Sequence, residues 1–170
     1  MAATDRLPPF QELLDSHAEA VLRFLRSAVG PGDADDCFQE TFISALRAYP
    51  RLEHGRELRA WLLTIARRKA LDHHRASARR PRPVAEPDAT ETAPGPAELN
   101  GSAAAAAIWG LVAALPEGQR AALALRYAGG LRYREVAEAL GCSEEAARRR
   151  VHDGLRALRR RSSELEEQYR

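Results

Sequence analysis

The chain has 170 residues, of which 45% are hydrophobic and 29% are charged, and its formal net charge is +2. This apolar content is enough to build hydrophobic cores, which excludes disorder throughout the chain. Because the net charge is small, any affinity for nucleic acid must come from local basic patches rather than from a basic field over the whole molecule.

The first 78 residues contain three helical patterns. Apolar residues recur at helical spacing from Phe10 to Ala28, and the glycines and proline of residues 30–32 end this pattern. A second helix is expected to begin near the acidic residues Asp33 to Asp36, because carboxylates stabilise a helix N-terminus, and to end at Pro50. A third follows the polar loop 51–56 and becomes strongly basic in its later half. These helices predict a first small domain over residues 1–78.

Residues 79–102 differ sharply from what precedes them. They contain five prolines and two glycines and no aromatic residue, a composition that favours an extended, flexible linker. The net charge of residues 81–102 is −3, whereas residues 1–80 carry +2 and residues 103–170 carry +3. The sequence therefore predicts two basic units joined by an acidic, proline-rich linker.

A second helical domain is expected over residues 103–161. An alanine-rich helix over residues 103–115 is followed by Pro116, which suits a first helical turn and opens a helix that continues to Tyr127. Glycines 129 and 130 end this helix. The last helix is expected to continue through Arg161, before a charged tail over residues 162–170.

Residues 131–158 have the pattern of a helix-turn-helix. An apolar stripe from Tyr133 to Leu140 is followed by Gly141, which can adopt the left-handed conformation, and by Ser143, which can cap the next helix. That next helix buries Ala147 and its successors at helical spacing and exposes several arginines, which suits entry into a DNA major groove. The alternative is an ordinary helical bundle, in which similar turns and arginine-bearing faces also occur.

No strand-like alternation of useful length occurs, so the fold is expected to be all-α. Cys37 and Cys142 are too far apart in the sequence to indicate a disulfide framework, and His73 and His74 lack a second ligand at helical spacing. No constellation of catalytic groups is present, and there is no apolar segment typical of a signal peptide or a membrane helix. We therefore expect a cytoplasmic protein without cofactor, metal or enzymatic activity.

Together these segments resemble the two-domain extracytoplasmic-function sigma factors of bacterial RNA polymerase. The resemblance is carried by DDCFQETFISAL (35–46), AWLLTIARRKALDHHR (60–75), LPEGQRAALALRY (115–127) and the helix-turn-helix, in the family's order and spacing. It implies a sigma factor that binds core RNA polymerase and directs promoter-specific transcription initiation, with promoter DNA and an anti-sigma factor as further partners.

The resemblance also implies three sets of site residues. The expected polymerase-binding residues are Asp35, Asp36, Gln39, Glu40 and Phe42. The residues expected to bind the downstream, minus ten, element are His54, Arg67, Arg68, Lys69, Asp72 and Arg75. Those expected to bind the upstream, minus thirty-five, element are Arg132, Ser143, Glu145, Arg148, Arg149, Arg150 and His152. Apart from the resemblance, an ordinary acidic helix start explains the first set as well, whereas a basic helix end without a partner explains Arg79 and Arg80 better than it explains the cluster of cations over residues 67–75.

The recognition helix departs from the family's usual sequence. Glu144 and Glu145 stand at the end that should approach DNA, where carboxylates repel phosphates but can accept a hydrogen bond from cytosine. Gly154 stands where alanine is frequent and should weaken the helix by about 1 kcal/mol. The alternative function is a sigma-like regulator whose N-terminal domain binds another protein, and a purely structural adaptor is the third hypothesis.

Overall fold

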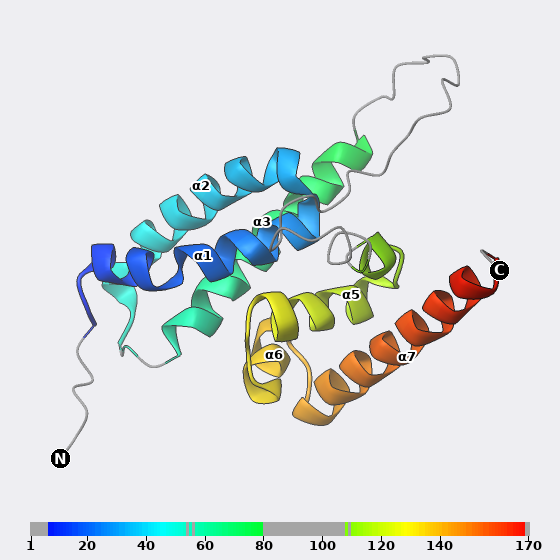
Figure 1. The fold of residues 1–170 in the computed structure, drawn as a ribbon. Coiled ribbons are helices and arrows are strands. Elements are labelled where there is room, and N and C mark those ends of the chain that lie inside the picture. Colours follow the sequence, from blue (N-terminus) through cyan, green and yellow to red (C-terminus); the bar gives the residue numbers. More distant parts are fainter. Residues whose placement is uncertain (1–6, 54, 56, 80–107, 109, 169–170) are drawn as a thin grey trace, which may run out of the picture.

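The computed structural model describes residues 7–53, 55, 57–79, 108 and 110–168 (Figure 1). Within these residues the ordered elements are helices and none is a strand, which confirms the all-α prediction. The expected linker, apart from Arg79, lies outside the described residues, and so does His54.

Three long helices build the N-terminal unit: α1 (Phe10–Val29), α2 (Pro31–Ala48) and α3 (Leu58–Arg79). The turn η1 (Tyr49–Arg51) closes α2. Helix α2 begins slightly earlier than expected because Pro31, whose backbone angle suits a first helical turn, starts it directly after Gly30. Val21 and Leu25 of the predicted α1 stripe and Leu62 of the α3 stripe are fully buried, whereas Leu13 and Phe24 of α1 are also buried although they lie outside the predicted stripe.

The C-terminal unit contains α5 (Glu117–Leu123), η2 (Ala124–Ala128), α6 (Tyr133–Leu140) and α7 (Glu144–Gln168). The helix expected from residue 117 to Tyr127 changes at Ala124 into a π-helical segment, in which the Gly129 amide donates to the Ala124 carbonyl at 2.9 Å. A Cβ at Gly129 would lie 2.6 Å from the Leu125 oxygen, so this ending requires glycine.

The predicted helix-turn-helix is present. Gly141 has φ 63° and ψ 41°, and the Cys142 amide donates to the Ala137 carbonyl at 3.0 Å, which closes the end of α6. The Ala146 amide donates to the Ser143 hydroxyl at 3.1 Å, which caps the start of α7. Both chemical signals of the turn are therefore confirmed.

The expected end of the last helix at Arg161 is wrong, because α7 continues to Gln168. Residues 162–168 contain neither glycine nor proline and are mostly good helix formers, so nothing in this stretch stops the helix. The Ser163 hydroxyl also donates to the Arg159 carbonyl at 3.1 Å within the extended part. The described part of the charged tail is thus helical.

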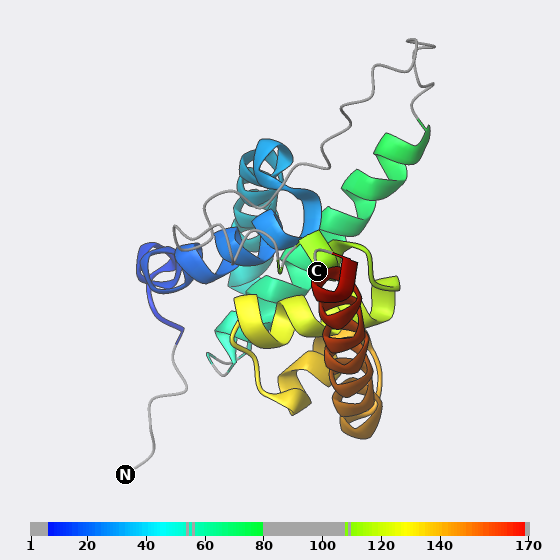
Figure 2. The same ribbon diagram turned by 45° about the vertical axis from the view of Figure 1, so that its right-hand side comes forward.

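The two units pack directly against each other. In Figures 1 and 2, α5, η2 and α6 lie beside α1 and α3, whereas α7 lies on the side of the C-terminal unit that faces away from them. A Cβ at Gly129 would lie 2.9 Å from the Leu63 side chain of α3, so the approach is close. The buried residues of both units form one continuous core.

Leu62 provides a test of the N-terminal core. Its side chain is fully buried, so Leu62→Ala should lower the free energy of unfolding by about 3 kcal/mol, from lost burial and the cavity left behind. Urea denaturation followed by circular dichroism measures this change. Leu46→Ala is the matched control, since Leu46 is 54% exposed and its truncation should change stability by less than about 0.5 kcal/mol. Equal losses from the two variants would contradict the assigned core.

Candidate protein-binding and nucleic-acid-binding surfaces

The first candidate surface lies on α2. Asp35, Asp36, Gln39 and Glu40 are all exposed, as expected for a set that contacts a partner. Only Glu40 among these four makes a described ion pair, with Lys69 of α3 at 3.6 Å. The start of α2 therefore presents carboxylates to solvent.

Cys37 lies beneath this acidic face. Burial raises the pKa of its thiol above the ordinary value, and the carboxylates of Glu40, Asp33 and Asp36 raise it further. The electrostatic effect agrees with a concentration of negative charge at this end of α2.

The two cysteines should differ in reactivity. Because a raised pKa leaves less thiolate and Cys37 is only 4% exposed, we expect iodoacetamide at pH 8 to modify Cys142 about tenfold faster. Peptide mass spectrometry over a time course measures both rates, and Cys142→Ser serves as the control for site assignment. Equal rates in the folded protein would show that α2 does not bury Cys37.

The expectation that Phe42 contacts a partner needs correction. Phe42 is only 7% exposed and packs against Phe10 and Phe38, with ring centroids 6.4 Å and 4.7 Å away. The large apolar side chains that α2 does expose are Ile43 and Leu46, which are 50% and 54% exposed. The sequence carried a signal for both, because they fall outside the apolar stripe that packs α2.

Asp36, Gln39, Ile43 and Leu46 are spaced three, four and three residues apart, so they form one exposed stripe along α2. We call this stripe the α2 surface. It combines a carboxylate and an amide with two large apolar side chains that are at least half exposed. Such a mixture of anchors and polar groups is typical of a protein-binding surface.

The basic residues of α3 point in different directions. Arg68, Asp72 and Arg75 are exposed at spacings of four and three, so they share one face, and Arg75 pairs with Asp72 at 3.6 Å. Lys69 instead reaches Glu40 of α2. The structure thus brings Arg68, Asp72 and Arg75 of the expected downstream set together on one exposed face. The two arginines of this face can contact DNA phosphates.

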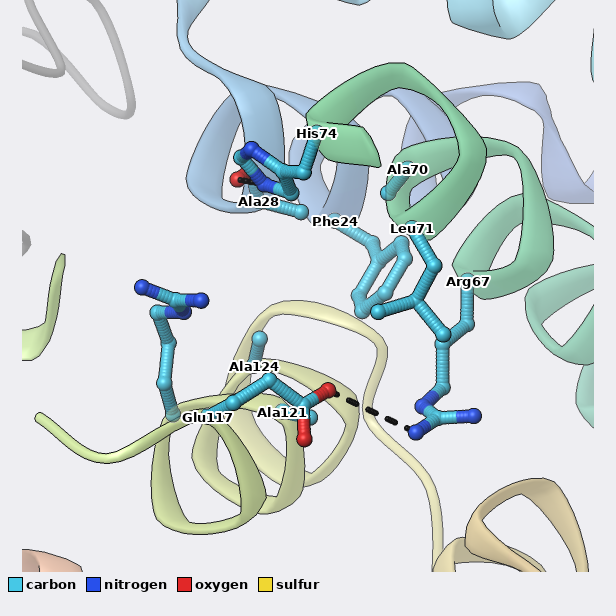
Figure 3. A pocket seen from close by; sticks show the side chains of 10 residues that line it. Phe24, Ala28, Arg67, Ala70, Leu71, His74, Glu117, Ala121 and Ala124 are labelled. Atoms are coloured by element: carbon cyan, nitrogen blue, oxygen red, sulfur yellow. Dashed lines mark hydrogen bonds and ion pairs between the residues drawn. The ribbon is translucent and has the colours of Figure 1, made fainter. Parts of the chain in front are cut away.

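Arg67 turns toward the C-terminal unit. Its guanidinium lies 3.4 Å from the Glu117 carboxylate of α5, across a small pocket lined by Phe24 and Leu71 on one side and by Ala121 on the other (Figure 3). A second ion pair between the units joins Arg134 of α6 to Glu57 at 3.2 Å.

The histidines of α3 have structural neighbours. His74 lies 2.9 Å from the Ala28 carbonyl at the end of α1, and His73 lies 3.2 Å from the Asp33 carboxylate. Among the described residues no group of His, Cys, Asp and Glu could hold a metal ion. No described helix is long and apolar enough to cross a membrane.

The recognition helix α7 exposes Glu145, Arg148, Arg149 and His152 of the predicted upstream set, and Ser143 just before α7 and Arg132 just before α6 are exposed as well. The glutamates at its start pair with arginines one turn later, Glu144 with Arg148 at 2.8 Å and Glu145 with Arg149 at 3.4 Å. The negative charge at this end is therefore matched locally.

Two residues of α7 also contact α5. Arg150 is half-buried, and its guanidinium lies within 3.7 Å of the position that a Cβ on Gly118 would occupy. A Cβ on Gly154 would lie 2.8 Å from the Leu123 side chain. Gly154 thus allows a close approach of α7 and α5, which explains a glycine inside a helix.

These features define a class: an all-α protein with a helix-turn-helix unit and a second unit that presents separate acidic and basic faces. Residues 13–80 match the family model of Sigma-70 region 2, and residues 105–158 match that of Sigma-70, region 4. The chain is 35% identical to the ECF RNA polymerase sigma factor SigC of Mycobacterium tuberculosis, covering 81% of this chain and 75% of that protein.

It is also 35% identical to the RNA polymerase sigma factor CarQ of Myxococcus xanthus, over 92% of this chain and 91% of that protein. The sigma factor RpoE of Bartonella quintana, solved with the anti-sigma factor NepR, has the same fold, with a TM-score of 0.72, 24% identity, and coverage of 89% of this chain and 94% of that one. The chain belongs to the ECF sigma factors, and as a sigma factor it directs transcription initiation.

Proposed function

We propose a division of labour among the three surfaces of this sigma factor. The α2 surface binds core RNA polymerase, the exposed face of α3 with Arg68 and Arg75 holds the downstream promoter element, and α7 holds the upstream element. The observation that carries the proposal is the placement of these surfaces on separate, exposed helix faces, one acidic and apolar, two basic. Catalysis is left to the polymerase, and the protein acts inside the cell where that enzyme works.

The α2 surface suits a partner with arginines and an apolar groove. Asp36 is exposed and makes no ion pair within the described chain, so a cation of the partner can reach it. Ile43 and Leu46 would become buried on binding, which supplies the apolar centre that stable interfaces need. Phe42 supports this surface from below through its aromatic contacts.

The two DNA-binding faces must separate to work together. The minus ten and minus thirty-five elements lie about 25 base pairs apart, which is about 85 Å along the duplex. In the structure the units touch, and Arg67 is paired with Glu117 of the other unit. We therefore propose that the packed arrangement is the resting form, and that the chain opens on the polymerase.

The length of chain between the units permits this opening. Residues 80–107 number 28, and a fully extended chain of that length spans up to about 95 Å. A partner protein that holds the units together would keep the sigma factor inactive. The anti-sigma factor in the solved RpoE structure makes such a partner a reasonable proposal for this chain.

Footprinting with reconstituted holoenzyme tests the division of labour. We expect the double variant Arg68→Ala/Arg75→Ala to lose protection and melting at the downstream element while upstream protection remains. The variant Arg148→Ala should weaken upstream protection instead. Permanganate reactivity of unpaired thymines reports the melting. If either variant lost protection at both promoter elements, or if neither variant lost protection at any, the assignment of α3 and α7 would be overturned.

A further inference from the structure

Three consecutive arginines of α7 have different surroundings. The only ion pair described for Arg149 is with Glu145 at 3.4 Å, and the two side chains are 72% and 85% exposed. Arg150 lies against α5 beside Gly118. Arg148 is held on two sides, because its guanidinium donates to the Glu144 carboxylate at 2.8 Å and lies over the ring of Tyr133.

Tyr133 belongs to the other helix of the helix-turn-helix. It is the first residue of α6, and the Arg148 Cζ lies 5.1 Å from its ring centroid. The guanidinium of Arg126 also lies over this ring, with its Cζ 5.1 Å from the centroid, and Arg126 donates a hydrogen bond to the Leu131 carbonyl at 3.0 Å. The ring is thus tied to the body of the unit, and a cation over a tyrosine face is attracted to it.

We propose that Tyr133 is a positioning residue that holds Arg148 in one orientation, so that Arg148 reads a guanine edge in the upstream element while Arg149 contacts phosphate. This rests on the proposed entry of α7 into the major groove. An arginine that reads guanine needs its planar fork aligned with both acceptors of the base. Holding the fork before DNA arrives removes the entropy cost of ordering a long side chain at that moment.

The contacts of Arg148 are compatible with this reading. A guanidinium has five N–H donors, and a bidentate contact with guanine uses two of them. The bond to Glu144 uses another, so Glu144 and the base can be bound together. Arg149 has no comparable support, since its only described partner is the largely exposed Glu145, and a mobile cation suits a phosphate contact.

The experiment is a double-mutant cycle on the holoenzyme. Promoter fragments carrying every single base-pair change in the upstream element are titrated with wild type, Tyr133→Leu, Tyr133→Phe, Arg148→Ala and the double variant Tyr133→Leu/Arg148→Ala. We expect Arg148→Ala to lower affinity about tenfold and to remove discrimination at one G·C pair. Tyr133→Leu should reduce discrimination at the same pair, about fivefold, and Tyr133→Phe should retain it.

The double variant should bind no more weakly than Arg148→Ala alone, since the ring acts through that arginine. Arg149→Ala should weaken all sequences alike and reduce the salt dependence of binding by about one ion, whereas Tyr133→Leu should leave that dependence unchanged. Arg148→Lys keeps the positive charge but removes the planar fork, so it should lose discrimination at the same base pair.

Additive losses in the double variant would overturn the positioning role, as would equal losses over all base pairs or a Tyr133→Phe variant that behaves like Tyr133→Leu. If Tyr133→Leu loses helicity, Glu144→Ala removes the acceptor that holds Arg148 from its other side, and unchanged discrimination by that surface variant would contradict the need to hold Arg148 in one orientation. Wild-type holoenzyme without any upstream preference would instead refute the proposed function of α7, and the positioning role with it.

Discussion

The Asp36→Arg variant should bind core RNA polymerase at least tenfold more weakly than the wild-type chain. Asp36 is exposed near the start of α2, beside the apolar side chains that we propose as the centre of the interface. Removing a charge from a close interfacial pair costs about 2–5 kcal/mol, and reversing it adds repulsion against the partner's cation. Fluorescence anisotropy of the labelled chain, titrated with core polymerase, measures the affinity.

Asp15→Arg is the matched control for this change. Asp15 is an exposed carboxylate on α1, so its reversal alters the net charge by the same amount away from the α2 surface. Its affinity for polymerase should stay within about twofold of the wild type. Leu46→Ala should weaken binding without loss of stability, because Leu46 is exposed. Equal effects of Asp36→Arg and Asp15→Arg would mean that only overall charge matters and would contradict a specific surface.

The Ala121→Arg variant should separate the two units. Ala121 lines the pocket between α5 and the N-terminal unit, together with Phe24, Leu71 and the cation of Arg67 (Figure 3). A long cationic side chain there overfills the contact and repels Arg67, while on a separated unit it would extend from the surface of α5 into water. Because the helices within each unit keep their packing, we expect the two units to separate and neither unit to unfold.

Small-angle X-ray scattering measures the opening. A packed chain of 170 residues should have a radius of gyration of about 16 Å. Two separated units joined through a chain segment of this length should give roughly 25 Å. Ala114→Arg, an exposed position just before α5, is the matched control and should remain packed. A packed Ala121→Arg variant, or one whose helicity falls, would contradict a separable contact.

Local chemistry made much of the fold predictable. The apolar stripes of α1, α2 and α3 identified the buried faces, and Gly141 and Ser143 specified the turn before α7 because left-handed backbone and an N-terminal cap each require particular residues. The π-helical segment η2 was not predictable in this way. Its hydrogen bonds depend on how residues 124–128 pack, and helical periodicity does not distinguish the two helix types.

The sequence predicts which residue types form the candidate sites better than it predicts the direction in which each side chain points. Arg67 and Arg68 are neighbours in a basic run, yet one pairs with Glu117 of the other unit and the other is exposed on α3. Sequence spacing gives the face of a helix, whereas the element that covers that face is set by tertiary packing. For the same reason the sequence predicts a partner contact for Phe42, which is buried in the packing stripe of α2, and does not single out the exposed Ile43 and Leu46.

The alternative of a regulator that keeps the sigma fold but binds another protein is less well supported. The relatives matched over most of the chain are sigma factors, and the faces that we propose for polymerase binding and for DNA binding are all exposed. That regulator would bind DNA without polymerase and would tolerate Asp36→Arg. A structural adaptor would show no salt-dependent DNA binding at all.

The most direct test is transcription by purified core RNA polymerase, with genomic DNA as template and the 5′ ends of the transcripts mapped by sequencing. With the wild-type chain added, transcripts should start at a discrete set of sites that share two upstream sequence elements, and Asp36→Arg should abolish these starts. If the chain adds no specific starts to those of core polymerase alone, or if Asp36→Arg leaves them unchanged, the assignment of the surfaces is contradicted.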